Sequence, residues 1–89
     1  MLKIASIKKF SRDEAKKVGD EMNLNWEKVD LEQFVMGLNV ELEHGTIKSE
    51  TNVTDDDPVL TAKIALAHIY ECSKYYTYLA QMEKKCKKD

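Results

Sequence analysis

The fold is decided by one segment near the middle of the chain, Asp57-Pro-Val-Leu-Thr-Ala-Lys-Ile-Ala-Leu-Ala-His-Ile-Tyr-Glu71. Asp57 followed by Pro58 is a strong helix-start signal. The aspartate can cap the first amide groups, and the N–H that proline lacks would be unpaired there anyway. Apolar residues then fall around most of the circumference of the helix expected over residues 58–71. Because a helix that is apolar nearly all round is buried, we expect this one in the middle of the domain.

Two helices are predicted before this segment. The first begins after Ser11, where Ser11 and Glu14 form a capping box, and it ends near Asn23, a residue that tolerates the left-handed conformation. The second begins after Asp30, with Gln33 completing another capping box, and Gly45 terminates it. The apolar stripe of the second helix consists of Leu31, Phe34, Val35, Leu38 and Leu42.

A fourth helix is predicted after Ser73, which would cap it. Its stripe consists of Tyr75, Tyr78, Leu79, Met82 and Cys86, at helical spacing. The sequence therefore predicts an all-α domain over residues 1–89, a compact bundle of about four helices with a long acidic loop between the second and third. Residues 1–10 are compatible with an arm, a short strand or a helical lead-in, and residues 84–89 form a basic tail.

Charge and hydropathy exclude several classes of function. The 14 Lys+Arg and 16 Asp+Glu give a net charge of −2, so the chain has no general electrostatic attraction to nucleic acid or to an anionic membrane. The lysines of the basic tail complement the dipole of the last helix, which we prefer to a nucleic-acid site. No apolar run approaches the roughly 20 residues that span a bilayer. Cys72 and Cys86 make no disulfide framework, and we expect a cytoplasmic protein.

Both histidines occur in matching pairs with a glutamate. Glu41 precedes His44 by three residues, and His68 precedes Glu71 by three residues. Residues at this spacing project from the same face of a helix. If the two helices are neighbours, the four side chains can converge and hold a divalent transition metal such as Zn or Fe. The hydroxyls of Tyr75 and Tyr76 could then support the site with hydrogen bonds.

Other interpretations of these pairs stay open. The same residues could form a structural polar network, in which His–Glu hydrogen bonds between helices are joined by a tyrosine hydroxyl. They could also form the site of a metal-dependent enzyme, which would need an open ligand position. The sequence gives no independent sign of such a position, so we lean away from an enzyme. A small cytoplasmic binding module is the leading hypothesis.

The acidic loop suggests a second kind of binding. Glu50, Asp55 and Asp56 could form the surface by which an adaptor or inhibitor contacts a protein partner. Calcium is a poor alternative, because an EF-hand loop has alternating acids and a central glycine, whereas Asp55, Asp56 and Asp57 are consecutive.

These segments together resemble a family of small, uncharacterised bacterial and phage-borne domains, over about residues 11–84. The segments that carry the resemblance are Trp26 with Asp30-Leu-Glu-Gln-Phe34, Gly37, Glu41-Leu-Glu-His-Gly45, Thr51-Asn-Val-Thr-Asp-Asp-Asp-Pro58, Lys63-Ile-Ala-Leu-Ala-His68, Glu71, Tyr75-Tyr76, Leu79 and Met82-Glu83. The family has no assigned activity. The resemblance implies that both Glu/His pairs and the acidic loop belong to its characteristic residues. One departure is Cys72-Ser73-Lys74, which stands where the family often has a proline between the last two helices.

Overall fold

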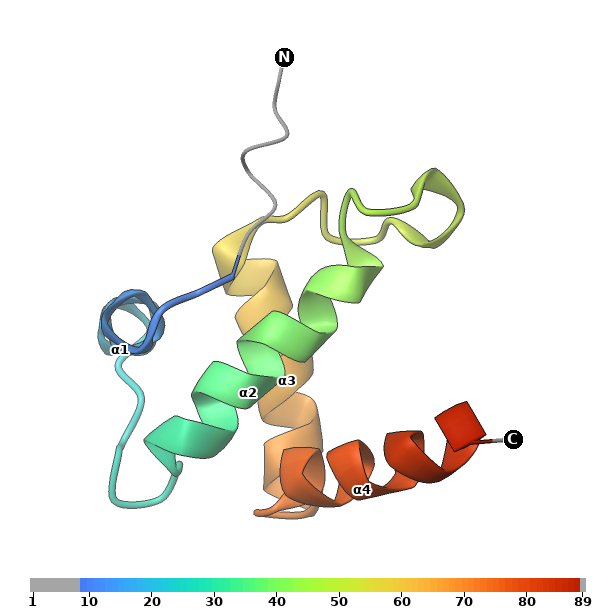
Figure 1. Ribbon diagram of the computed structural model, residues 1–89. Coiled ribbons are helices and arrows are strands. Elements are labelled where there is room, and N and C mark those ends of the chain that lie inside the picture. Colours follow the sequence, from blue (N-terminus) through green and yellow to red (C-terminus); the bar gives the residue numbers. More distant parts are fainter. Residues whose placement is uncertain (1–8, 89) are drawn as a thin grey trace.

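The computed structural model describes residues 9–88 of the chain and contains helices throughout (Figure 1). The helices are α1 (Arg12–Glu21), α2 (Leu31–Glu41), α3 (Pro58–Glu71) and α4 (Tyr75–Lys88), with two short 3₁₀ turns, η2 (Leu42–His44) and η3 (Ser49–Thr51). No strand occurs among residues 9–88, so the predicted all-α class is confirmed. Most of the segment for which an arm or short strand was considered, residues 1–8, lies outside the described residues.

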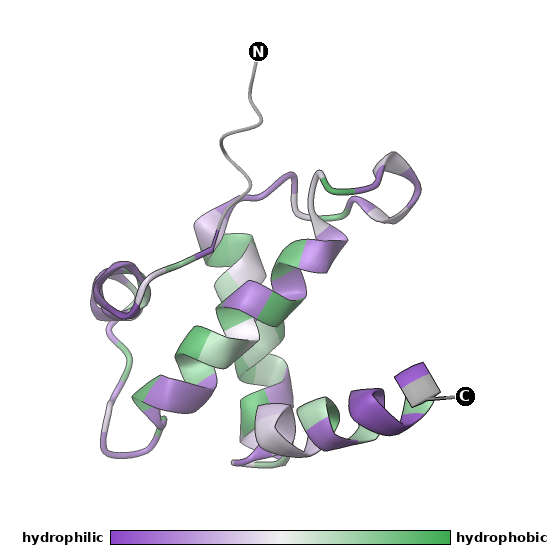
Figure 2. Cartoon of the chain, viewed as in Figure 1, coloured by the Kyte–Doolittle hydropathy of each residue, from purple (hydrophilic) through white to green (hydrophobic). Residues whose placement is uncertain are grey.

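The centre of the fold is the crossing of α2 and α3, which share the largest helix–helix interface (Figure 1). Helix α3 buries the side of small and branched residues that includes Ala62, Ala65 and Ile69. Helix α3 contacts all three other helices, so its predicted central position is confirmed, although its other side leaves Val59, Leu60 and Tyr70 exposed. The central position is shared, because α2 also contacts all three other helices. Figure 2 shows apolar residues gathered on α2 and α3, whereas α1 is largely hydrophilic.

A row on α2 sets how closely α4 approaches. Gln33, Gly37 and Glu41 follow one another at four-residue spacing, so they lie along one side of the helix. All three are buried, and all three meet Tyr76 of α4. A Cβ atom at Gly37 would lie 2.6 Å from Cε2 of the Tyr76 ring and 2.9 Å from Cβ of Ala65. Glycine is required at this position because α3 and α4 both press against it.

Helix α1 is attached to α2 through Trp26. The Trp26 ring lies against the backbone of Gly19 and meets Phe34 edge to face, with 5.6 Å between the ring centroids. The indole N–H of Trp26 donates a 2.7 Å hydrogen bond to Asp20, and this bond is the main reason that the pKa of the Asp20 carboxyl is lowered. The glycine inside α1 is thereby explained, since any side chain at position 19 would collide with the indole.

Two of the predicted helix caps are confirmed. Ser11 and Glu14 form the reciprocal capping box, and the Asp57 side chain accepts hydrogen bonds from the N–H groups of Val59 and Leu60. Asn23 has a φ of 62°, as expected of a left-handed terminator.

The capping box predicted for Asp30 and Gln33 is wrong. The Asp30 side chain makes no capping hydrogen bond, and Gln33 is buried instead of reaching back to the helix start. Its amide oxygen accepts the N–H of Tyr76 at 3.0 Å, and its amide nitrogen donates to the Thr77 hydroxyl at 2.7 Å. Gln33 therefore satisfies one of the free amide groups at the start of α4, a function predicted for Ser73.

The loop between α2 and α3 is held by its own polar groups. The His44 carbonyl accepts the N–H of Val53 at 2.6 Å, and the Asp56 carboxylate accepts the N–H and hydroxyl of Thr46 at 2.9 and 2.5 Å. Asp56 also lies where a Cβ of Gly45 would be, so this glycine is needed for the close approach and has an ordinary φ of −102°. None of the helices in the described region is long and apolar enough to cross a membrane.

We predict that Gly37→Ala destabilises the fold by about 1–3 kcal/mol, because the added methyl group overpacks the meeting point of α2, α3 and α4. Alanine in place of glycine inside an unobstructed helix would instead stabilise by up to about 1 kcal/mol. Urea unfolding followed by circular dichroism measures the difference. Ala67→Gly, at an exposed position of α3, is the control for helix propensity alone. A Gly37→Ala protein more stable than wild type would contradict this packing.

Candidate functional site

The candidate site is built around the side chain of Glu41. This residue ends α2 and is only 3% exposed, so its carboxylate is almost completely removed from solvent. Its Oε2 atom accepts a 2.6 Å hydrogen bond from the hydroxyl of Tyr76. Its Oε1 atom has no hydrogen-bond partner, and it is the one buried side-chain oxygen or nitrogen in the described region that lacks one. A buried carboxylate with an unsatisfied oxygen is costly, so this position calls for a positive partner.

Two imidazoles lie beside the carboxylate. Nε2 of His44, in the η2 turn, is 3.4 Å from Oε1 of Glu41, and Nε2 of His68, on α3, is 3.8 Å from Oε2. The His44 side chain is 44% exposed and the His68 side chain 34% exposed, so both rings can be reached from solvent while the carboxylate cannot. The arrangement is a buried acid whose two solvent-facing neighbours are bases.

Tyr75 and Tyr76 both contribute to this cluster, in different ways. The Tyr75 ring is stacked on the His68 ring, with 4.3 Å between centroids and 8° between planes. The Tyr76 ring meets both His68 and Tyr75 edge to face. Burial raises the pKa of the Tyr76 phenol well above its ordinary value, and the hydrogen bond to Glu41 raises this pKa further. The phenol therefore stays protonated and keeps donating to Glu41.

The structure does not bring the fourth predicted residue to the cluster. Glu71 is exposed at the last position of α3, and neither ion pair formed by the two histidines includes it. Three residues of helix advance the chain by about 4.5 Å, so Glu71 lies a good part of a turn beyond His68 along the axis of α3. The spacing predicts that His68 and Glu71 share one face of α3, but of the two only His68 forms an ion pair with Glu41.

In the described part of the chain, no group of three or more His, Cys, Asp or Glu side chains stands at the spacing of metal ligands. Each imidazole faces a different oxygen of the Glu41 carboxylate. The cluster therefore resembles the polar network considered from the sequence, with the Tyr76 hydroxyl joining it, except that the 3.4 and 3.8 Å separations are too long for good hydrogen bonds.

The carboxylates of the acidic loop are of two kinds: some hold the local structure, and others are exposed. Asp56 is half-buried and holds the loop through Thr46, and Asp57 caps α3. Glu50 and Asp55 are exposed. Of the three residues suggested as a partner surface, Glu50 and Asp55 are therefore the exposed ones, and Oδ1 of Asp55 accepts a 3.3 Å hydrogen bond from the Asn52 amide.

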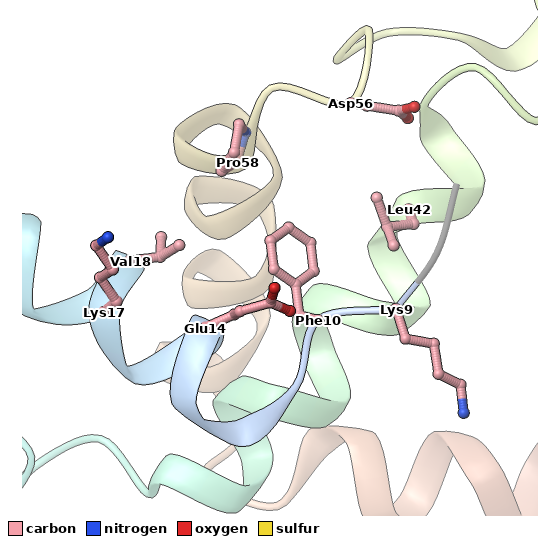
Figure 3. Close-up of a pocket in the computed structure, with 8 residues that line it drawn as sticks. All are labelled: Lys9, Phe10, Glu14, Lys17, Val18, Leu42, Asp56 and Pro58. Carbon is pink, nitrogen blue, oxygen red and sulfur yellow. The ribbon is translucent and has the colours of Figure 1, made fainter. Parts of the chain in front are cut away.

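A cavity that the sequence did not predict lies on another part of the molecule. It has a volume of about 410 Å³ and lies among α1, the end of α2 and the start of α3, around the ring of Phe10 (Figure 3). Its lining combines apolar side chains with charged ones at the rim: Lys9, Phe10, Glu14, Lys17, Val18, Leu42, Asp56 and Pro58. No residue of the Glu41 cluster lines it. Residues from four separate segments form it, so no local pattern in the sequence could have indicated it.

The chain matches a known protein family. A family model described as Protein of unknown function (DUF5661) matches residues 15–85. The chain belongs to this family. The DUF5661 match spans the whole Glu41 cluster and the acidic loop, so the expected uncharacterised domain family is confirmed, while a bacterial or phage origin stays a prediction. No curated protein and no solved structure matches the chain.

We predict that Tyr76→Phe lowers the free energy of unfolding by about 1–3 kcal/mol at pH 7, because the buried Glu41 carboxylate then loses the hydrogen bond from the Tyr76 hydroxyl. Chemical denaturation measures the change. Tyr78→Phe is the matched control, since this phenol is exposed, and it should change stability by less than about 0.5 kcal/mol. Equal effects of the two substitutions would contradict the assigned hydrogen bond.

The stabilising effect of Tyr76 should also depend on pH. Because its folded pKa is raised, the unfolded chain loses the phenolic proton first as the pH increases. The contribution is complete below the unfolded pKa of about 10 and is lost progressively above it. The stability difference between wild type and Tyr76→Phe should therefore narrow above about pH 10. A difference that widens there would contradict the raised pKa.

Proposed function

We propose that this domain is a small binding module that takes up a divalent first-row transition cation, Zn²⁺ or Fe²⁺, between Glu41, His44 and His68. The observation that carries the proposal is the unpartnered Oε1 of a buried carboxylate with two imidazoles beside it. Imidazole nitrogen and carboxylate oxygen are donors that suit these ions.

The charge balance of the site favours a cation. Tyr76 donates to Glu41 but stays neutral, so the hydroxyl satisfies one oxygen without removing the negative charge. Among the groups hydrogen-bonded to Glu41 or within ion-pair distance of it, only the two imidazoles can neutralise it, either as imidazolium or by sharing a metal ion. A divalent ion held by neutral imidazoles compensates the carboxylate and supplies the missing partner of Oε1 at the same time.

The distances between the donor atoms can be compared with those around a tetrahedral zinc ion. Two ligand atoms on one tetrahedral zinc ion, each about 2.0–2.1 Å from the metal, lie about 3.3 Å apart. The separation between His44 Nε2 and Glu41 Oε1, 3.4 Å, already agrees with this value. The separation of 3.8 Å at His68 is longer, so His68 must turn towards Oε1 when the ion enters. Its partial exposure leaves room for that movement, and Tyr75, stacked on its ring, limits the direction.

The proposal predicts one high-affinity Zn²⁺ or Co²⁺ ion per chain in isothermal titration calorimetry at pH 7.5. His44→Ala, His68→Ala and Glu41→Gln should each weaken binding by at least about tenfold, since loss of one ligand removes a coordinate bond. Cobalt supplies a second readout, because its visible absorption identifies tetrahedral coordination by nitrogen and oxygen.

Glu71→Gln is the matched control for these variants. Glu71 is an exposed glutamate outside the cluster, so its substitution should leave the metal affinity unchanged. The proposal is contradicted if wild-type protein binds neither ion, or if removal of both histidines leaves the affinity unaltered. A loss at Glu71 as large as that at Glu41 would contradict the three-ligand site.

A further inference from the structure

The cavity around Phe10 lies where the described part of the chain begins (Figure 3). Lys9 and Phe10 are the first two described residues, and both line the cavity. The backbone of Phe10 is fixed to α2 here, because its N–H donates a 2.6 Å hydrogen bond to Oδ1 of Asn39 and its carbonyl accepts a 3.1 Å hydrogen bond from the Asn39 amide. Leu42, three residues after Asn39, is another lining residue. The chain therefore enters the described region at the edge of the cavity, at an anchored position.

The lining of the cavity favours an apolar occupant over a charged one. Its apolar residues are Phe10, Val18, Leu42 and Pro58, and the charged residues at its rim are Lys9, Lys17, Glu14 and Asp56. Two positive and two negative groups leave the rim with no net charge, and both carboxylates already accept hydrogen bonds from backbone N–H groups. An ion of either sign would therefore meet charges of its own sign, whereas an aliphatic side chain would remove apolar surface from water.

The sequence of residues 1–8, which lie outside the described residues, supplies aliphatic side chains within reach of the cavity. Leu2, Ile4 and Ile7 are apolar. Ile7 precedes Phe10 by three residues, so the chain between their Cα atoms spans at most about 11 Å. An isoleucine is thus tethered directly to the anchored edge of an apolar cavity.

We propose that residues 1–8 fold back over this cavity and that Ile7 packs among Phe10, Val18 and Leu42. The cavity volume of about 410 Å³ exceeds that of one aliphatic side chain, and Ile4 is the second occupant. The bound segment would join the start of α1 to the η2 turn that follows α2, and so close the molecule on the side opposite to neither helix alone but between both.

A tethered segment has an advantage over a separate molecule as the occupant. A short flexible tether gives the attached group an effective concentration in the millimolar range, which a free apolar ligand would have to match. The hydrogen bonds of Phe10 to Asn39 leave only two residues between the anchor and Ile7, so closing this short connection costs little entropy. The proposal does not depend on the metal site, because no residue of the Glu41 cluster lines the cavity.

NMR of the full chain with labelled methyl groups tests the contact directly. The δ1 methyl of Ile7, assigned by its disappearance in Ile7→Val, should give nuclear Overhauser effects to the Phe10 ring and to the methyl groups of Val18 and Leu42. Ile47 is the matched reference, because it is 56% exposed on the loop between α2 and α3, and its methyl should give none of these. An Ile7 methyl without any contact to the cavity residues overturns the proposal.

The variant Ile7→Ser provides two further readouts. Because an apolar contact is lost, its unfolding equilibrium constant in urea should rise by at least about fivefold, whereas Ile47→Ser should change this constant by less than about threefold. The emptied cavity should also bind the uncharged apolar dye N-phenyl-1-naphthylamine, so the dye should fluoresce more with Ile7→Ser than with wild type at equal helix content by circular dichroism. Unchanged stability of Ile7→Ser overturns the proposal. Dye binding by wild type as strong as that by Ile7→Ser also overturns it, and would identify a cavity open to free ligands.

Discussion

The burial of the Glu41 carboxylate is the constraint on which the rest of the structure depends. An ionised carboxylate is excluded from a protein interior unless hydrogen bonds and opposite charge compensate its lost hydration. Here the groups beside the carboxylate come from three different elements: a phenol on α4, which donates a hydrogen bond, an imidazole on α3 and an imidazole in the turn after α2. Glu41 thus requires all three elements to meet at one point.

Tyr76 connects this requirement to the packing of the helices. The three residues of the row on α2 contact different parts of Tyr76: Gln33 accepts its N–H, Gly37 accommodates its ring, and Glu41 accepts a hydrogen bond from its hydroxyl. One aromatic residue therefore sets both the start of α4 and the environment of the carboxylate. Because α4 is attached mainly through its first turns, its outer part extends beyond the domain. The same attachment that completes the Glu41 cluster thereby leaves the outer part of α4 exposed.

Much of the fold could be predicted from local signals, because caps and apolar periodicity act within a few residues. Ser11 with Glu14 and Asp57 with Pro58 mark helix starts correctly. The capping box predicted for Gln33 is wrong because a capping box and a tertiary hydrogen bond require the same residue type, and only the position of α4 distinguishes them. Two polar residues in an otherwise apolar face, with glycine midway, would have been the signal for the row on α2.

The candidate site was predictable only in part, for a similar reason. The spacing of Glu41 and His44 determines their proximity, since both belong to one continuous stretch of helical turns. The approach of His68 depends on the crossing of α2 and α3, which the apolar stripes indicate only roughly, and the same crossing leaves Glu71 outside. Binding of the cation is tested most directly by NMR, which records the imidazole nitrogen resonances of both histidines during addition of Zn²⁺. If the cation binds between Glu41, His44 and His68, the Nε2 resonances of both histidines shift together and saturate at one equivalent. Resonances that stay unmoved, or a shift of one ring alone, would contradict this site.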